Sequence, residues 1–393
     1  MNVIEQFLAR AAGLERVRPG DRIRVGVDLA LAHDGSAPAV VSEFARTGTE
    51  RVFAGDRVIF CFDHALPAPT VAAREGHRRA AEFAEKQGIR LFDRGEGVVH
   101  QVVFDEISPG RGSIVVGADG HVCTAGGYGA LGFSVKPDQL SSVLATGEFE
   151  LTVPEVAVFE ISGHIKPPLS AKDVILHVLG RFGPEGMKGR AAVFTGEAMA
   201  GASVDERMTI TNMVSEMGAL TGYVSEESDP GPVESLLRLD VKDIPVSVAR
   251  PPSPCSVGPI EEVEGTEISE VIIGACSCGR LSDMEAVAGI LKGRRVHRGV
   301  TLVVVPASRR VAGEMDRLGL SAAIRESGGI VVNPGCGPCF GAHQGLLMND
   351  DAAVSTTTRN NPGRIGDREA QIYLASPLVA AESAVAGRIT RPG

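Results

Sequence analysis

The sequence lacks three features that would assign it to common classes of protein. No apolar run approaches the ~20 residues that a membrane-spanning helix needs. Residues 1–6 have neither the charge nor the apolar run of a signal peptide, so we expect a cytosolic location. The 39 basic residues are scattered and outnumbered by 49 acidic ones, a net charge of −10, so nucleic acid is not an expected partner.

Cysteine is also scarce, with seven residues in a chain of 393. An odd count without secretory features indicates reduced thiols rather than a disulfide framework. Four of the seven form two short motifs, C-x-C within 274–280 and C-x-x-C within 333–341. Each motif follows an apolar segment typical of a buried strand, 271–273 or 330–332, and its glycines allow close approach of backbone to a ligand. The spacing alone fits either structural zinc or an iron–sulfur cluster.

Helical and strand-like patterns alternate along the chain, which predicts an α/β fold. Strands are expected at 57–62 and 114–116, with a helix at 71–87 between them. Two further helices are expected to begin with capping boxes, in which a serine and an acidic residue three positions later satisfy free amides. These pairs are Ser203 with Glu206 and Ser282 with Glu285.

The second of these helices should bury one face, formed by Met284, Val287, Ala288 and Leu291. A last helix is expected to begin at Ser376-Pro377 and to end near Gly387.

Proline-containing connections suggest the domain boundaries. The candidates are the segments 152–155 and 251–254, which predict α/β domains at 1–153, 154–248 and 249–393. A strand followed by a small-residue turn recurs at 115–121, 272–280 and 331–339, as if three such turns met at one site.

Several turns also carry groups suited to acid–base chemistry and to carboxylate binding. Two arginines in the loop 355–364 can grip a di- or tricarboxylate, although such a polar loop by itself is also typical of a solvated surface. Asn212 and Glu216 are spaced to share one helix face, or to form a solvated stripe. His77, His177 and His297 are interpreted as hydrogen-bonded core or surface imidazoles.

The motifs resemble the aconitase superfamily, and most of all the large subunit of 3-isopropylmalate dehydratase and its homoaconitase relatives. The similar segments run nearly end to end, and 333–343 is the most specific of them. They are 27–34, 62–67, 97–101, 117–124, 206–213, the two cysteine motifs and 355–367.

The resemblance implies three α/β/α domains around one central [4Fe-4S] cluster, without the swivelling fourth domain. It implies a lyase of amino-acid biosynthesis (leucine biosynthesis for a 3-isopropylmalate dehydratase) that reversibly dehydrates a hydroxy di- or tricarboxylic acid. A homoaconitase or methylmalate-type hydratase is the alternative within the family. A non-catalytic protein with zinc or a fully ligated cluster is the alternative outside it.

The resemblance also assigns roles to residues. The implied metal ligands are Cys276, Cys336 and Cys339, which leave one iron open to substrate. The implied catalytic residues are Asp63, His64, His100, Asp119, His121 and Glu216. The implied substrate-binding residues are His33, Arg359 and Arg364, and the implied cluster neighbours are Asn212, Cys278 and Thr358.

The family's proton-abstracting serine lies in the swivelling domain, and nothing after Gly393 supplies it. We therefore expect a small subunit as partner, in a heterodimer or heterotetramer.

Five positions depart from the family pattern. Gly120 replaces a usual serine, Val122 a threonine, Thr358 an asparagine, Gly35 a common β-branched residue and Cys278 an asparagine. Loss of a hydroxyl that binds a buried carboxylate costs about 1–3 kcal/mol, so a changed substrate is expected. Cys278 can be a fourth ligand, a redox partner of Cys276 or a small buried side chain, and we favour the last.

Overall fold

A computed structural model describes residues 1–225 and 231–393. These residues combine helices with largely parallel sheets, which confirms the α/β prediction. They divide into two compact units: unit 1 comprises Met1–Arg94, Val102–Gly163 and Met187–Leu239, and unit 2 comprises Gly95–Gln101, His164–Gly186 and Asp240–Gly393. The division into three domains at 153 and 248 stays a prediction. Within the described ranges, every helix is too short or too polar to cross a lipid bilayer.

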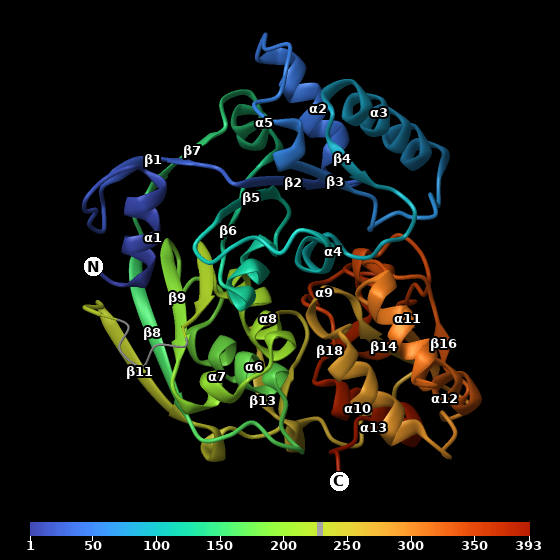
Figure 1. Cartoon of the computed structure of the whole chain (residues 1–393). Coiled ribbons are helices and arrows are strands. Elements are labelled where there is room, and N and C mark those ends of the chain that lie inside the picture. The colour runs from blue at the N-terminus through green and yellow to red at the C-terminus, as the bar shows by residue number, and fades with distance from the viewer. Residues whose placement is uncertain (226–230) are drawn as a thin grey trace. The chain divides into compact units, whose positions relative to one another are not determined.

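Unit 1 contains a five-stranded, fully parallel sheet of order β4-β3-β2-β5-β6. Its strands are β2 (Leu29–His33), β3 (Val58–Cys61), β4 (Arg90–Phe92), β5 (Ile114–Ala118) and β6 (Leu131–Ser134). Every residue of β3 and β5 is buried, because helices cover both faces of such a sheet. Helices α2 (Ala37–Arg46), α3 (Val71–Gln87) and α5 (Pro137–Thr146) lie beside it (Figure 1).

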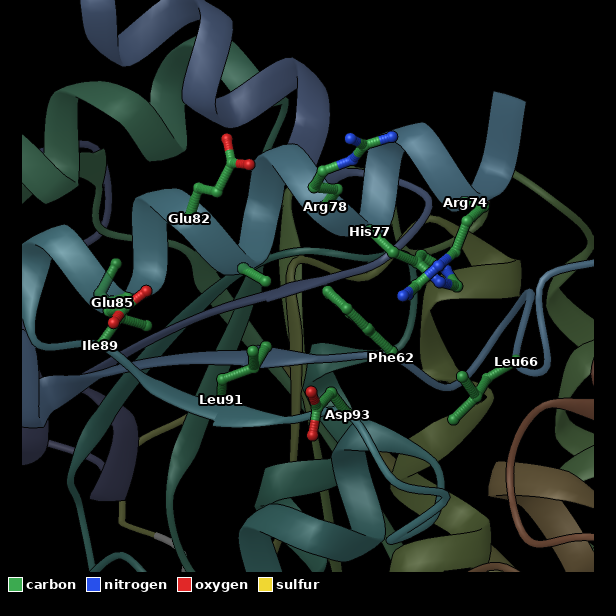
Figure 2. Close-up of a pocket in the computed structure, with 11 residues that line it drawn as sticks. Phe62, Leu66, Arg74, His77, Arg78, Glu82, Glu85, Ile89, Leu91 and Asp93 are labelled. Atoms are coloured by element: carbon green, nitrogen blue, oxygen red, sulfur yellow. The ribbon is translucent and has the colours of Figure 1, made fainter. Parts of the chain in front are cut away.

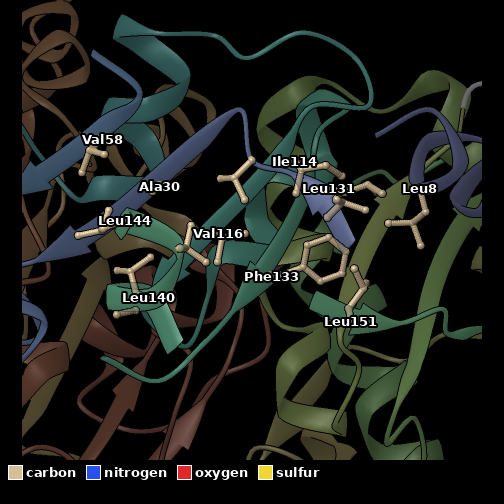
Figure 3. Close-up of a cluster of buried hydrophobic side chains, with 14 of the residues drawn as sticks. Leu8, Ala30, Val58, Ile114, Val116, Leu131, Phe133, Leu140, Leu144 and Leu151 are labelled. Carbon is tan, nitrogen blue, oxygen red and sulfur yellow. The ribbon is translucent and has the colours of Figure 1, made fainter. Parts of the chain in front are cut away.

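A hydrophobic core holds these layers together (Figure 3). Leu140 and Leu144 lie one turn apart on α5, and both are fully buried with Val116 of β5 in the same cluster. Burial of each such side chain contributes about 1.5–3 kcal/mol, so the core fixes the sheet from which the site residues project.

The rest of unit 1 comprises two smaller sheets and several short helices. β1 (Arg22–Gly26) pairs antiparallel with β7 (Glu148–Thr152). The other sheet has the order β10-β9-β8-β11, with strands β8 (Glu155–Ser162), β9 (Arg190–Thr195), β10 (Thr221–Val224) and β11 (Ser235–Asp240). The helices are α1 (Val3–Ala11), α7 (Glu197–Gly201), α8 (Val204–Asn212) and the 3-10 helices η1 (Gly55–Arg57), η2 (Val122–Tyr128) and η3 (Val214–Met217).

Unit 2 contains a seven-stranded sheet of order β13-β12-β18-β17-β14-β15-β16. The run from β18 to β16 is parallel, while β12 is antiparallel to both neighbours. The strands are β12 (Ser247–Ala249), β13 (Val257–Pro259), β14 (Glu270–Gly274), β15 (Thr301–Val305), β16 (Ile330–Val331), β17 (Ala352–Ser355) and β18 (Gln371–Leu374).

The helices of unit 2 surround this sheet. They are α6 (Ala171–Phe182), α9 (Ala275–Cys278), α10 (Leu281–Leu291), α11 (Arg309–Arg317), α12 (Leu320–Ser327), α13 (Pro377–Ala386) and the 3-10 helices η4 (Val241–Asp243), η5 (Ile260–Glu262) and η6 (Gly337–Phe340). Helix α4 (Val99–Glu106) contributes residues 99–101 to unit 2 and 102–106 to unit 1.

Local sequence signals predicted several of these elements. The predicted helix at 71–87 matches α3, and Ser203 caps α8 by accepting a hydrogen bond from the amide of Glu206 at 3.3 Å. α13 begins after Ser376 and ends before Gly387, also as predicted.

Two predictions were wrong. The capping box of α10 uses Asp283, whose carboxylate accepts from the amide of Arg280 at 3.0 Å, because the helix already begins at Leu281. The predicted buried face of α10 is nevertheless correct. The segment 330–332 is not a buried strand, since β16 is an edge strand and Ile330 is 51% exposed.

Candidate functional site

Three adjacent parallel strands of unit 1 end in acidic and histidine residues. β2 ends at His33, Asp63 and His64 follow β3, and Asp119 follows β5. The order β3-β2-β5, with His33 paired with Cys61, brings these strand ends side by side. The carboxyl ends of parallel strands are where α/β sheets bind ligands, so this edge is a candidate site.

The carboxylate of Asp119 lies among three histidines. One oxygen is 3.6 Å from Nε2 of His33 and 3.9 Å from Nε2 of His64. The other oxygen accepts a hydrogen bond from the backbone amide of His121 at 2.6 Å. The rings of His33 and His64 are stacked, with centroids 3.9 Å apart. Asp119 is therefore placed to orient these rings and to stabilise a positive charge on one of them.

The two stacked histidines take opposite protonation states. Burial and the charge of His64 lower the pKa of His33 to about 4. Burial also opposes charge on His64, but Asp63, 2.7 Å away, and Asp119 together raise the pKa of His64 to about 9. At neutral pH, His64 carries a proton that it can donate and His33 is uncharged. Neighbouring groups whose pKa values are pushed apart are typical of acid–base sites.

The tautomer of His33 follows from its second contact. The backbone amide of Gly35 donates to Nδ1 of His33 at 3.1 Å, so the neutral ring carries its proton on Nε2, toward Asp119. His33 is therefore a neutral hydrogen-bond donor, which suits the substrate-binding role that the resemblance implied.

Asp34 anchors the turn that carries Asp63 and His64. Its carboxylate accepts hydrogen bonds from the amides of His64 and Ala65, at 2.9 and 2.7 Å, and lies 3.1 Å from Nε2 of His77. Burial favours the neutral acid, but the contact with His77 and the charge of His64 hold the pKa of Asp34 well below its usual range. The role of Asp34 was missed, although it directly follows a candidate site residue.

His77 is a hydrogen-bonded core imidazole, as its sequence context indicated. It stacks on Phe62 with ring centroids 4.5 Å apart. The same two side chains line a groove of about 410 Å³ between α3 and β4 (Figure 2).

Four of these residues have the spacing of a metal-ion site. The ligand atoms of His33, Asp34, Asp63 and His64 all lie within 4.8 Å of one another. However, Nδ1 of His64 already contacts a carboxylate oxygen of Asp63 at 2.7 Å. The oxygens of Asp34 already accept several hydrogen bonds. We therefore interpret the four as an acid–base group.

A second acid–base pair involves His121 and Glu216. Nε2 of His121 lies 2.9 Å from a carboxylate oxygen of Glu216, and both side chains are less than 10% exposed. Glu216 lies on η3, while α8 ends at Asn212, so the prediction that both share a face of one helix was wrong. Met213, with a φ of −96° and a ψ of 0°, is the C-cap of α8 and separates it from η3.

Asn212 is not part of a solvated stripe, because it is fully buried. Its amide donates to Oγ1 of Thr124 at 2.9 Å, and its Oδ1 has no hydrogen-bond partner among the described residues.

In unit 2, Cys276 follows β14, and Cys336 and Cys339 follow β16. All three are buried, with at most 4% of their surface exposed. η6, which carries Cys339, ends at Gly341 with a φ of +74°, where an added Cβ would overlap the carbonyl oxygen of Arg364. The second cysteine turn is therefore in close backbone contact with the arginine loop.

The first cysteine turn is strained. Gly274 has a φ of 129°, and a Cβ there would overlap the carbonyl oxygen of Val305. Ala275 has a φ of +59°, in the left-handed region that alanine rarely adopts. Such strain persists where surrounding structure enforces it, often at functional sites, and here it directs Cys276.

The spacing of the thiols argues against a single zinc ion. A tetrahedral zinc with Zn–S bonds of about 2.3 Å would bring its sulfurs to about 3.8 Å from one another. Within residues 1–225 and 231–393, no group of three cysteines has all its sulfurs within 4.8 Å of one another. At least one pair among Cys276, Cys336 and Cys339 is therefore farther apart than the sulfurs of a tetrahedral zinc site.

Arg364 gives further support for an anionic group. One of its terminal nitrogens donates to Sγ of Cys339 at 3.5 Å, while its buried Nε has no partner in the described part of the chain. Burial disfavours the charge of Arg364, but thiolate charge on Cys339, Cys336 and Cys276 raises its pKa above the usual range.

Cys278 differs from these three cysteines. It is fully buried, its sulfur lies 3.6 Å from Oγ of Ser277, and burial raises its pKa to about 12 although Lys172 acts in the opposite direction. A thiol that stays protonated is a poor metal ligand, which supports the interpretation as a packing side chain.

The loop 355–364 is not a plain solvated loop. Its first four residues, Ser355 to Thr358, are at most 1% exposed, and only further along do Arg359 and Arg364 become partly exposed. Oγ1 of Thr358 has no hydrogen-bond partner among the described residues. Polar side chains can be buried here because they hydrogen-bond to one another, as the hydroxyls of Ser355 and Thr357 do at 2.7 Å. The polar composition of the loop therefore does not indicate solvent exposure.

Two buried cations near the first cysteine turn were missed by sequence reasoning. Arg280, 1% exposed, donates to the carbonyl oxygens of Cys276 and Ser277 at 2.7 and 2.9 Å and to Gln101 at 3.0 Å. Lys172 of α6 is equally buried. Nothing in the sequence marked these two residues as buried, because lysine and arginine are almost never fully buried without partners and are therefore expected at the surface.

The predicted site residues are divided between the two units. Unit 1 holds His33, Asp63, His64, Asp119, His121, Asn212 and Glu216. Unit 2 holds His100, Cys276, Cys278, Cys336, Cys339, Thr358, Arg359 and Arg364. His100 is buried in the first turn of α4, close in sequence to Val98, which packs on Cys276.

The pKa of His64 predicts a pH-dependent stability. Its value rises from 6.5 to about 9 on folding, so the stabilisation is fully present below pH 6.5 and is lost as the pH rises to 9. We expect the free energy of unfolding to fall by on the order of 2–3 kcal/mol more in the wild type than in His64→Gln across this window. Denaturant titrations at both pH values check this, and equal losses in the two proteins would contradict it.

Comparison with known proteins places the chain in a family of hydratases. The chain belongs to the aconitase family (aconitate hydratase), whose model matches residues 8–229 and 237–387. It is therefore a hydro-lyase with an aconitase-like α/β fold.

Several relatives match nearly end to end. The chain is 40% identical to a probable 3-isopropylmalate dehydratase large subunit of Methanothermobacter thermautotrophicus, over all of this chain and 99% of that protein. It is 40% identical to a 3-isopropylmalate dehydratase large subunit of Methanopyrus kandleri, over 99% and 98% of the two chains. It is 39% identical to a probable methanogen homoaconitase large subunit of M. thermautotrophicus, over 100% and 97%.

Proposed function

We propose that this chain is the cluster-binding large subunit of a 3-isopropylmalate dehydratase-like enzyme. The reaction is the reversible loss and re-addition of water on a hydroxy di- or tricarboxylic acid. The observation that carries the proposal is the combination of three buried cysteines that follow parallel strands with end-to-end similarity to relatives of that name.

We propose that Cys276, Cys336 and Cys339 hold one [4Fe-4S] cluster. When bound, such a cluster with three thiolate ligands supplies an open, Lewis-acidic iron that polarises the bond to the leaving hydroxyl. The separation of at least one pair of these sulfurs by more than 4.8 Å and the unpartnered Nε of Arg364 support a bridging, negatively charged group.

The acid–base residues of unit 1 are proposed to act in the same reaction. His64, kept protonated by Asp63 and Asp119, donates its proton to the departing hydroxyl and recovers it when water adds back. His33 stays neutral and donates a hydrogen bond through Nε2. The paired His121 and Glu216 transfer a proton between them, since their polar atoms are 2.9 Å apart.

The residues of unit 2 are proposed to bind the substrate. Arg359 and Arg364 bind carboxylates through their planar guanidinium groups. Oγ1 of Thr358, buried without a partner among the described residues, is available for a polar group of the substrate. We assign His100 to the same reaction because it is buried in the unit that carries the cysteines.

A small subunit is the proposed partner, and the cytoplasm is the proposed location. The names of the relatives, which call them large subunits, support the partner. The resemblance places the proton-abstracting serine on the swivelling domain of that partner. The substrate is 3-isopropylmalate or a close analogue, and homocitrate or homoaconitate is the alternative because a homoaconitase relative matches with 39% identity.

The proposal is tested by co-expressing the chain with a small-subunit gene that neighbours its own. After anaerobic reconstitution with iron and sulfide, hydroxy acids are screened for alkene formation by ultraviolet absorbance. We expect turnover of at least one of them by the pair, and little by either chain alone. An intact cluster without turnover of any substrate would favour a non-catalytic metal protein instead.

A further inference from the structure

The feature that this mechanism leaves unused is a lysine buried beside the cysteine turns. Lys172 lies in the first turn of α6 in unit 2 and is 1% exposed. Its ammonium contacts three acceptors, namely Oγ of Ser277 at 2.9 Å and the carbonyl oxygens of Thr356 and Thr357 at 3.0 and 2.8 Å. An ammonium has three N–H donors and no acceptor, so these contacts use its full hydrogen-bonding capacity.

These contacts connect the turns that follow two neighbouring strands. β14 leads to Ser277 and β17 leads to Thr356, and the two strands are paired in parallel. Oγ1 of Thr356 also accepts from the amide of Gly274 at 2.9 Å. Lys172 and Thr356 therefore hold the turn of Cys276 against the start of the arginine loop.

The charge of Lys172 has no matching carboxylate. Within the described ranges, no acidic side chain lies within 4.0 Å of its ammonium, and all three hydrogen-bond acceptors are neutral. Burying an ionised group without a partner is costly, so a stable buried ammonium requires compensating negative charge.

The cysteines are the groups whose negative charge acts most strongly on Lys172. Burial lowers the pKa of Lys172, and the thiols of Cys278, Cys276 and Cys339, when ionised, oppose that shift more strongly than any carboxylate does. Cys278 stays neutral because burial raises its own pKa to about 12. Of these three, Cys276 and Cys339 are proposed ligands. The position therefore suits a permanent negative charge on the group that the thiolates hold.

We propose that Lys172 is a positioning residue that acts as the internal counter-cation of the thiolate-bound group and fixes the Cys276 turn to the arginine loop. This inference rests on the proposed iron–sulfur function. A cation near a redox group stabilises its more negative, reduced form, so Lys172 raises the reduction potential of the group. It does so without touching substrate.

The test compares the full-length wild type with Lys172→Gln and Lys172→Met after anaerobic reconstitution. Glutamine keeps amide donors but loses the charge, and methionine loses both. Lys292→Met is the matched control, because Lys292 is a surface lysine of the same unit. The measurements are iron and sulfide per chain, and a dithionite titration followed by electron paramagnetic resonance.

At a fixed potential, the ratio of reduced to oxidised group is expected to fall at least tenfold in both Lys172 variants, a shift of 59 mV for one electron. The control is expected to match the wild type. Potentials equal to that of the control would overturn the inference.

Thermal melts of the cluster-free proteins cover the case in which a variant folds poorly. If Lys172 acts through charge, the cluster-free variants should fold. The difference in melting temperature between the wild type and each variant should then be larger in the cluster-loaded form than in the cluster-free form. Failure of both cluster-free variants to fold, while the control folds, would make Lys172 a purely structural residue and overturn the inference. A wild type that binds no iron and sulfide would refute the proposed function itself.

Discussion

Cys276→Ala is expected to abolish iron binding and to lower kcat at least about a hundredfold, whereas Cys278→Ala should retain both. Loss of a residue that only supports a metal ligand already costs 10–100-fold, so loss of a ligand costs more. The two cysteines are both buried and lie two residues apart, but burial keeps the pKa of Cys278 near 12, so it stays a neutral thiol. Iron and sulfide per chain, and kcat with the small subunit, are the measurements.

Cys278→Ala is the control for local disruption, because this replacement perturbs the same turn as Cys276→Ala does. If Cys278→Ala also lost its iron, Cys278 would be a fourth ligand and the open iron of the proposed mechanism would be refuted. Cys278→Asn adds a further comparison, since it introduces the asparagine that the family pattern usually has there. Higher activity in Cys278→Asn than in the wild type would show that the thiol limits the reaction.

Asp119→Asn is expected to lower kcat by about 10²–10⁴-fold, the range attributed to general acid–base catalysis. The amide removes the negative charge near His33 and His64 but keeps an oxygen for the amide of His121. The pKa of His64 should fall as a result, which shifts the alkaline limb of the pH profile of kcat toward neutral pH. The measurements are that profile and a proton NMR titration of the histidines.

Asp138→Asn is the matched control, because Asp138 is an exposed residue in the first turn of α5 in the same unit. It should leave both kcat and the pKa of His64 unchanged. A normal kcat in Asp119→Asn, with a lowered pKa of His64, would show that the charge on His64 is not needed for catalysis.

Local sequence signals were sufficient to predict features that depend on a single helix or strand. Helix α3 was predicted at its observed bounds, and the buried face of α10 was correct, because helical periodicity and end signals act within a few residues. The cysteine motifs and the strand-end histidines were also recognisable, since their residue types and order match a known family.

Other features depended on partners distant in sequence. The polar run from Ser355 to Thr358 looked solvated, yet it is buried and bonded to Gly274 and Lys172. His33 and His64 take opposite protonation states because burial and the charge of His64 lower the pKa of His33, while carboxylates that follow neighbouring strands raise the pKa of His64.

The sequence by itself determined the α/β class, the family, the two cysteine motifs and several of the helices, because these depend on short-range patterns and residue order. Only the tertiary structure decided that His33 and His64 differ in charge, that Asp34 and Arg280 support the site, and that Lys172 is buried beside the cysteines. The physical reason is that charge states depend on burial and on the distance to other charges. Both quantities are fixed only when separate strands and helices pack together.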